Sequence, residues 1–138
     1  MRIIVVDDHA IVREGLRALL RAEPGLRVVG EAADGEKALA VAAKADPDLA
    51  LVDIGMPGMG GVETARRMRR AHPGIRVIMV SINDDLGHVV DSFDAGACGY
   101  VVKDNVCEEL SQAIEAARAG RRYCSPALRA SLASRAPR

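Results

Sequence analysis

The sequence has no tryptophan, one phenylalanine and two tyrosines, so aromatic side chains make up only 2% of its 138 residues. A core without aromatic bulk must be filled by Val, Ile, Leu, Ala and Met. These are the usual residues between parallel strands and the helices that cover them. The composition therefore favours an α/β fold.

Long hydrophobic runs and paired cysteines are also missing. No apolar run approaches the roughly 20 residues that a membrane-spanning helix needs, and a strand-like run begins directly after Met1 and Arg2. Cys98, Cys107 and Cys124 are odd in number and lack CxxC spacing, which argues against a disulfide framework and against a zinc site. We therefore expect a soluble, cytoplasmic protein.

Acidic residues are absent from the C-terminal end. The 19 acidic and 19 basic residues cancel overall, but no acid follows Glu115, whereas six arginines do. The acidic body argues against nucleic-acid binding, and we interpret the basic end as a solvated linker, with a contact strip as the alternative. A second basic run lacks interleaved aromatics and is interpreted as a solvated helix face. It comprises Arg66, Arg67, Arg69 and Arg70.

Short β-branched runs alternate with segments of helical spacing. The runs predict five strands, over residues 3–6, 26–30, 49–54, 77–80 and 100–102. Helices are expected after each strand, and the last three cover about 61–71, 83–96 and 105–120. This alternation predicts a (βα)5 doubly wound, flavodoxin-like parallel sheet with strand order 2-1-3-4-5. We place the domain boundary near residue 122, which leaves residues 123–138 as a linker.

Charged and hydroxyl side chains stand at the carboxyl ends of the predicted strands. They are Asp7 and Asp8 after the first, Asp53 at the end of the third, Ser81 after the fourth and Lys103 after the fifth. Ligands bind at these ends in an open parallel sheet, and the first and third strands are neighbours in this order, so three carboxylates would share one crevice. Such a trio suits Mg²⁺, and a lysine and a hydroxyl suit phosphoryl oxygens. The set predicts a phosphoryl group on Asp53.

Ordinary structural roles remain open for the single residues. Asp8 and Ser81 could each cap the following helix, and Lys103 could pair with Asp104. His9 could sense pH or ligate a metal, but Mg²⁺ prefers oxygen, so we interpret His9 as a bystander at a helix start. The joint position of the five residues at strand ends is what favours a functional site.

Three stretches resemble the signature blocks of response-regulator receivers. They are VVDDH at 5–9, LVDIGMPGM at 51–59 and GACGYVVKD at 96–104. The DDH, MPGM and GYVVKD forms are most similar to the NarL/FixJ (LuxR-type) subfamily of two-component systems. The resemblance covers residues 1 to about 122.

The resemblance implies that Asp53 takes a phosphoryl group from a sensor histidine kinase. Asp7, Asp8, Asp53 and the backbone carbonyl of Gly55 would hold Mg²⁺, and Lys103 would pair with the phosphoryl oxygens. Such a protein is a phosphoacceptor with at most slow autodephosphorylation, and not an enzyme.

The resemblance also implies a conformational switch that controls an output domain. Ser81 would be drawn inward to the phosphoryl group, and Tyr100 would follow into the vacated space. Receivers of this subfamily usually precede a helix-turn-helix DNA-binding domain, and a homodimer is a further possibility. We therefore expect a transcription regulator whose DNA-binding domain would follow the linker, beyond Arg138.

Some positions depart from the family or keep rival functions open. Gly60 stands where the family often has an acid, and Asp104 follows Lys103 where many receivers have proline, which leaves the geometry of that peptide bond open. Haloacid-dehalogenase-type phosphatases also use an aspartyl phosphate, but they need a general acid at the position of Gly55. A flavodoxin-like electron carrier would need hydroxyls, amides and aromatics near the first strand. A receiver that is never phosphorylated is the third alternative.

Overall fold

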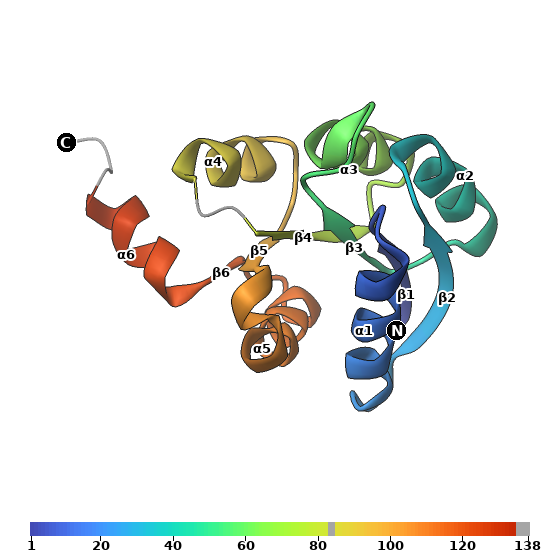
Figure 1. The fold of residues 1–138 in the computed structure, drawn as a ribbon, viewed down its shortest axis with the longest axis horizontal. Helices are drawn as coiled ribbons and strands as arrows, with labels where there is room; N and C mark the ends of the chain where they lie inside the picture. Colours follow the sequence, from blue (N-terminus) through green and yellow to red (C-terminus); the bar gives the residue numbers. More distant parts are fainter. Residues whose placement is uncertain (83–84, 135–138) are drawn as a thin grey trace.

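Six parallel strands form one sheet in the computed structural model, which describes residues 1–82 and 85–134 (Figure 1). The strands are β1 (Arg2–Val6), β2 (Arg27–Ala32), β3 (Leu49–Asp53), β4 (Arg76–Ser81), β5 (Gly99–Val102) and β6 (Tyr123–Cys124). They are ordered β2-β1-β3-β4-β5-β6 across the sheet. The predicted flavodoxin-like order 2-1-3-4-5 is therefore confirmed, with one strand added beside β5.

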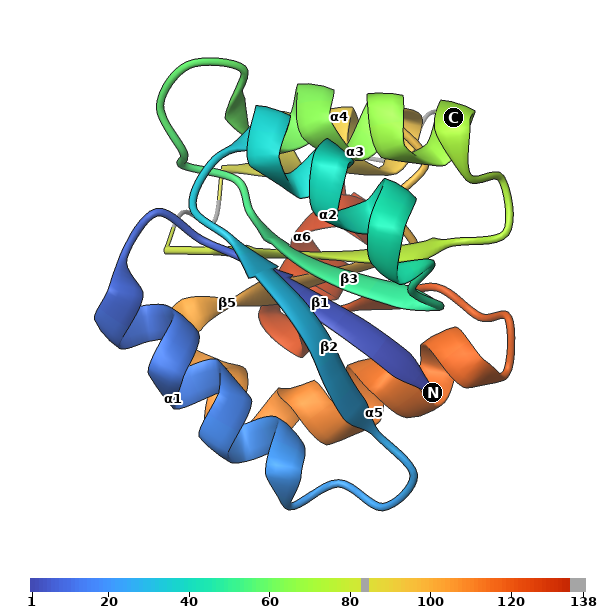
Figure 2. The same ribbon diagram turned by 90° about the vertical axis from the view of Figure 1, so that its right-hand side faces the viewer.

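Helices cover both faces of the sheet. They are α1 (Ala10–Arg21), α2 (Gly35–Ala45), α3 (Gly60–Ala71), α4 (Leu86–Asp94), the 3-10 helix η1 (Lys103–Asn105), α5 (Val106–Arg118) and α6 (Pro126–Ser134). Figure 1 shows α2, α3 and α4 on one side of the sheet and α1 and α5 on the other, and Figure 2 shows the same layers from the β2 edge. None of the described helices is long and apolar enough to cross a bilayer.

The core lies in two layers because successive strand residues point to opposite faces. In β1, Ile4 and Val6 pack toward α2, α3 and α4, whereas Ile3 and Val5 pack toward α1 and α5. All four side chains are buried. The short aliphatic residues that the composition supplies thus fill both layers of a parallel sheet.

The start of α4 shows how a local side chain sets a helix boundary. The Asp85 carboxylate accepts a hydrogen bond of 2.7 Å from the backbone N–H of Gly87, which satisfies one of the free donors of the first turn. The predicted helix start also included Asn83 and Asp84, which lie outside the described residues.

The described residues after 122 form a strand and a helix, which adds a sixth strand to the five that were predicted. Tyr123 and Cys124 pair in parallel with Gly99 and Tyr100 of β5, and α6 follows directly. An edge strand leaves N–H and C=O groups unpaired, and β6 satisfies part of that edge. Two residues are too few to show a period of two, so the sequence pattern did not reveal this strand.

Candidate functional site

Three carboxylates meet at the carboxyl ends of two neighbouring strands. Asp7 and Asp8 directly follow β1, and Asp53 is the last residue of β3. Asp7 is fully buried, Asp53 is 5% exposed and Asp8 is half-buried. Ligand atoms of these three residues and of His9 all lie within 4.8 Å of one another. The crevice that the sequence predicted is therefore present.

Lys103 supplies positive charge to this cluster from the first position of η1, directly after β5, which lies two strands away from β3. Its Nζ lies 3.0 Å from Asp7 Oδ2 and 3.3 Å from Asp53 Oδ1. Burial alone would lower the pKa of Lys103, but Asp7 and Asp53 together outweigh it and raise the pKa above its usual value. None of the described peptide bonds is cis, so the Lys103–Asp104 bond is trans.

The ionisation of Asp53 reflects opposing influences. Burial raises its pKa most strongly, and the nearby charge of Asp7 adds to this effect. The backbone N–H of Gly55 donates a hydrogen bond of 3.1 Å to Asp53 Oδ1 and, like Lys103, lowers the pKa. Together these influences raise the pKa of Asp53 above its usual value. A bound cation would act in the opposite direction, because positive charge favours the ionised carboxylate.

Two oxygens of the cluster lack a well-aligned donor. Asp7 Oδ2 and Asp8 Oδ1 are buried and accept no regular hydrogen bond within the part of the chain that is described. Their close contacts are ion pairs, with Lys103 at 3.0 Å and with His9 Nδ1 at 3.1 Å respectively. Buried carboxylate oxygens that accept no regular hydrogen bond are suited to a hard, oxygen-binding divalent cation.

His9 contacts the acids and is more than a neighbour in sequence. Its Nδ1 lies 3.3 Å from Asp7 Oδ1, and its backbone N–H donates a hydrogen bond of 2.9 Å to the same oxygen. The side chain is 68% exposed. The structure thus places His9 at the rim of the cluster, in contact with it, whereas the sequence suggested a bystander.

An open cleft of about 840 Å³ lies above Asp53. Lys103 and Ser81, two of the predicted strand-end residues, line it together with Gly55, and Ser81 is almost fully buried at the end of β4. Tyr100 is instead fully buried in the core beneath α4, so the structure does not place it in the cleft.

A family model of the response regulator receiver domain matches residues 3–115. The chain belongs to the response regulator receiver family. The receiver carries its acids and its lysine at the strand ends where the resemblance of the three sequence blocks placed them.

Curated relatives agree with this assignment. The receiver is 41% identical to the response regulator GacA of Pseudomonas viridiflava over 133 residues, which are 96% of this chain and 62% of the relative. It is 39% identical to the nitrate/nitrite response regulator protein NarL of Escherichia coli K12, over 96% of this chain and 61% of NarL. The chain thus spans about three fifths of these relatives, which support a NarL/FixJ-type receiver.

A solved structure shares the fold closely. The crystal structure of a LuxR-family two-component response regulator from Aurantimonas sp. SI85-9A1 superposes with a TM-score of 0.93 at 41% identity. The match covers 97% of this receiver and 96% of that chain, so it reaches beyond α5.

The sequence missed most of the side chains that α3, α4 and their loops contribute to the cleft. These side chains include Met56, Met59, Arg66, Ile82 and His88. Arg66 was interpreted as part of a solvated face, yet it lines the cleft and pairs with Glu63 at 2.5 Å. The Glu–Arg spacing of three residues on one helix was the available signal for that pair.

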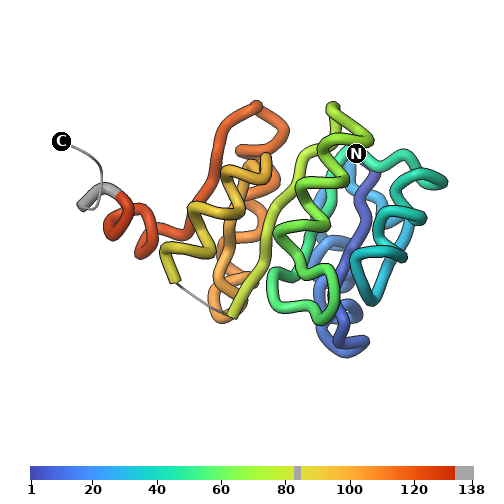
Figure 3. The backbone as a smooth tube through the Cα atoms, turned by 90° about the horizontal axis from the view of Figure 1, so that it is seen from above, coloured from blue at the N-terminus to red at the C-terminus, as the bar shows by residue number. Residues whose placement is uncertain are grey.

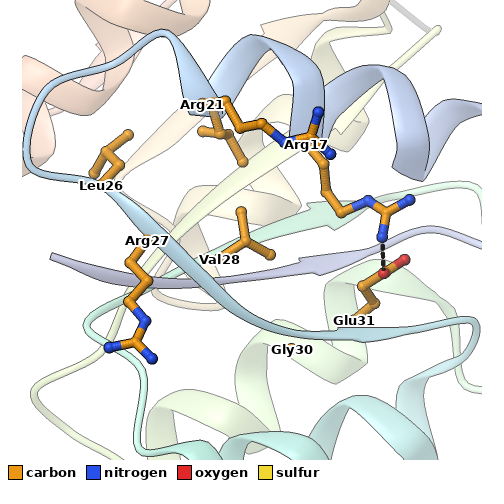
Figure 4. Close-up of a pocket in the computed structure, with 8 residues that line it drawn as sticks. Arg17, Arg21, Leu26, Arg27, Val28, Gly30 and Glu31 are labelled. Atoms are coloured by element: carbon orange, nitrogen blue, oxygen red, sulfur yellow. Dashed lines mark hydrogen bonds and ion pairs between the residues drawn. The ribbon is translucent and has the colours of Figure 1, made fainter.

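A second hollow, of about 710 Å³, lies between α1 and β2 (Figure 4). Arg17, Arg21 and Arg27 line it over an apolar floor, and Arg17 pairs with Glu31 at 2.5 Å. The lining includes none of Asp7, Asp8, Asp53 and Lys103. The carboxylates and the lysine that could handle a phosphoryl group therefore lie at the cleft above Asp53 and not at this hollow.

Proposed function

We propose that Asp53 accepts a phosphoryl group from a sensor histidine kinase, and that the receiver thereby controls an output domain. The observation that carries this proposal is the ion pair between Lys103 and Asp53. It joins the residue that follows β5 to the carboxylate at the base of an open cleft. A half-buried lysine beside a nucleophilic carboxylate is suited to the charge on the equatorial oxygens of a transferred phosphoryl group.

Asp7, Asp8, Asp53 and the backbone carbonyl of Gly55 would hold Mg²⁺. The orphaned oxygens of Asp7 and Asp8 fit this role, because they face the cluster without a regular donor. When bound, the ion supplies positive charge that neutralises both the carboxylates and the phosphoryl oxygens. The positions of the Asp7, Asp8 and Asp53 carboxylates determine where the ion's charge would lie.

In the transfer, a carboxylate oxygen of Asp53 attacks the phosphorus of the kinase phosphohistidine. The new O–P bond forms as the P–N bond breaks, and the imidazole nitrogen keeps the electron pair. Lys103 and Gly55 both contact Oδ1 of Asp53, which leaves Oδ2 as the attacking oxygen. Gly55 also stands where a haloacid-type phosphatase would carry its general acid, so hydrolysis is expected to be slow.

Ser81 and Tyr100 would convert the chemistry into a change of shape. The Ser81 hydroxyl lines the cleft at the end of β4 and would donate a hydrogen bond to the phosphoryl group. Tyr100 is already fully buried beneath α4, so its ring does not have to enter from solvent. The response would therefore be a repacking of α4 against Tyr100.

The proposed role in transcription is based on membership of the response regulator family. We propose a cytoplasmic transcription regulator in which residues 123–138 lead toward a helix-turn-helix domain that binds DNA, with a homodimer as a possible active form. The cognate kinase is the partner that delivers the phosphoryl group.

The proposal is tested by incubating the chain with acetyl phosphate and Mg²⁺ and measuring its intact mass. We expect the wild type to gain one phosphoryl group and Asp53→Asn to gain none. Asp104→Asn is the matched control, because Asp104 is an exposed acid beside Lys103 and outside the cluster. An adduct of equal yield in Asp53→Asn would overturn the assignment.

A further inference from the structure

The segment after α5 is attached to the edge of the sheet next to the site. Tyr123 and Cys124 of β6 pair with β5, and the Tyr123 hydroxyl donates a hydrogen bond of 2.8 Å to the buried Glu109 of α5. Arg129 of α6 donates from Nε to the Cys124 carbonyl at 2.9 Å. The base of α6 is therefore fixed to β5 and α5.

One contact of this segment lies beside the site lysine. Ser125, at the junction of β6 and α6, accepts a hydrogen bond of 3.2 Å on its Oγ from the backbone N–H of Val102. Its own N–H donates to the Tyr100 carbonyl at 3.2 Å, and the residue is only 1% exposed. Because Val102 directly precedes Lys103, Ser125 helps to hold the end of the strand that presents the lysine.

A second contact lies on α4. Leu128 of α6 is 4% exposed and belongs to the same buried cluster as Val89 of α4 and Tyr100. The Arg122 guanidinium lies 5.1 Å from the ring centroid of Phe93, also on α4, which is within the range of a cation–π interaction. Figures 1 and 3 show α6 beside the α4 end of the molecule. The helix thus covers part of the face that α4 and β5 share.

We propose that α6 is an intramolecular clamp on α4 and on the end of β5, and that phosphorylation of Asp53 weakens its docking. The inference rests on the proposed function. A phosphoryl group would draw Lys103 away from Asp7, and it would draw Ser81 inward. The two places where the clamp is held, Val102 and α4, would then shift together. The α4–β5 face would then become free for a partner or for the output domain.

Coupling of this kind is reciprocal. If a phosphoryl group weakens the docking of α6, then undocking of α6 must strengthen the binding of a phosphoryl mimic by the same factor. Leu128→Gln should undock α6, because it places an amide in an apolar contact. Ala130→Gln introduces the same side chain on an exposed position of the same helix and is the matched control.

The test compares hydrogen exchange of the α6 amides with and without beryllofluoride and Mg²⁺, in the full chain. We expect exchange in residues 126–132 to accelerate about fivefold or more when the mimic binds. In parallel, titration should show tighter beryllofluoride binding by Leu128→Gln than by the wild type, by a similar factor, and unchanged binding by Ala130→Gln. Ser125→Ala should act in the same direction as Leu128→Gln.

The outcomes separate the clamp from the proposed function. Formation of the acetyl phosphate adduct on Asp53 with unchanged α6 exchange would overturn the clamp alone. Faster α6 exchange together with equal mimic affinity in all variants would also overturn it, because the coupling would not be reciprocal. Absence of any adduct on Asp53 would overturn the proposed function and the clamp with it.

Discussion

Lys103 Nζ lies 3.3 Å from Asp53 Oδ1, although Lys103 directly follows β5 and Asp53 ends β3, with β4 between these two strands. The lysine is also 3.0 Å from Asp7 Oδ2, so one cation balances two buried carboxylates. A buried charge that loses its partner is costly, and this arrangement therefore makes the site part of the stability of the fold.

Replacement of Lys103 by methionine keeps the length of the side chain and removes its charge. We expect the unfolding free energy without Mg²⁺ to fall by about 2 kcal/mol, because Asp7 and Asp53 would remain buried without a cation. Added Mg²⁺ should recover more stability in this variant than in the wild type. Denaturant titration with and without Mg²⁺ measures both effects. Lys37→Met, at an exposed pair 4.0 Å from Asp34, should change stability little.

Replacement of Asp8 by asparagine should weaken Mg²⁺ binding. A unit charge near a divalent ion at the protein surface is worth about 1–4 kcal/mol, so the loss should be about tenfold or more. Isothermal titration with Mg²⁺ measures the affinity, and Asp104→Asn serves as the control outside the cluster. Equal affinity in the Asp8 variant and the wild type would remove Asp8 from the metal site.

Gly61 packs against the backbone at Asp53. A Cβ on Gly61 would overlap the carbonyl oxygen of Asp53 and lie 2.6 Å from the Cα of Ile54. Gly61→Ala should therefore destabilise the fold by about 1–3 kcal/mol and disturb the cleft. At Gly74, a Cβ would meet no atom within 4 Å, so Gly74→Ala should be nearly neutral. Thermal unfolding of both variants is the measurement, and similar losses in both would contradict the packing argument.

The raised pKa of Tyr123 leads us to expect a loss of stability at high pH. Burial and the hydrogen bond to Glu109 raise its pKa from 10.0 to about 12. Since the folded state holds the phenol proton more tightly than the unfolded state, this contribution is intact below pH 10 and is lost as the pH rises toward 12.

The size of the pH effect can be isolated with Tyr123→Phe. A pKa shift of this size corresponds to about 3 kcal/mol of unfolding free energy, which is lost between pH values well below 10 and well above 12. The wild type should lose that much more than Tyr123→Phe over the interval, and urea titrations at several pH values measure the difference. Parallel pH profiles would show that the phenol is not protected by the fold.

The described part of the C-terminal segment contains a strand and a helix that were not predicted from the sequence pattern. Residues 123–138 were expected to be a linker, because their composition is rich in Arg, Ser, Ala and Pro. The signals for a helix were nevertheless present: proline at the first helical position, and Leu128 and Leu132 four residues apart. Whether such a short amphipathic segment folds depends on a surface to receive it, and α4 and β5 supply that surface.

His9 and Tyr100 illustrate a second limit. The position of His9 in the sequence suggested a bystander, and the family resemblance implied that Tyr100 moves into a vacated space on phosphorylation, which stays a prediction. The structure places His9 Nδ1 within 3.3 Å of Asp7 Oδ1, and it buries Tyr100 completely. Rotamers and burial are set by neighbours from other elements, which no local pattern reports.

The sequence alone determined the strand and helix alternation, the parallel sheet and the edge where Asp7, Asp8, Asp53 and Lys103 would gather. It could do so because parallel strands bring their carboxyl ends to one edge, whatever the loops do. Only the tertiary structure decided which atoms touch: the reach of Lys103 across β4, the walls that α3 and α4 give the cleft, and the docking of α6. Those contacts join residues far apart along the chain, and their geometry arises only when the layers pack.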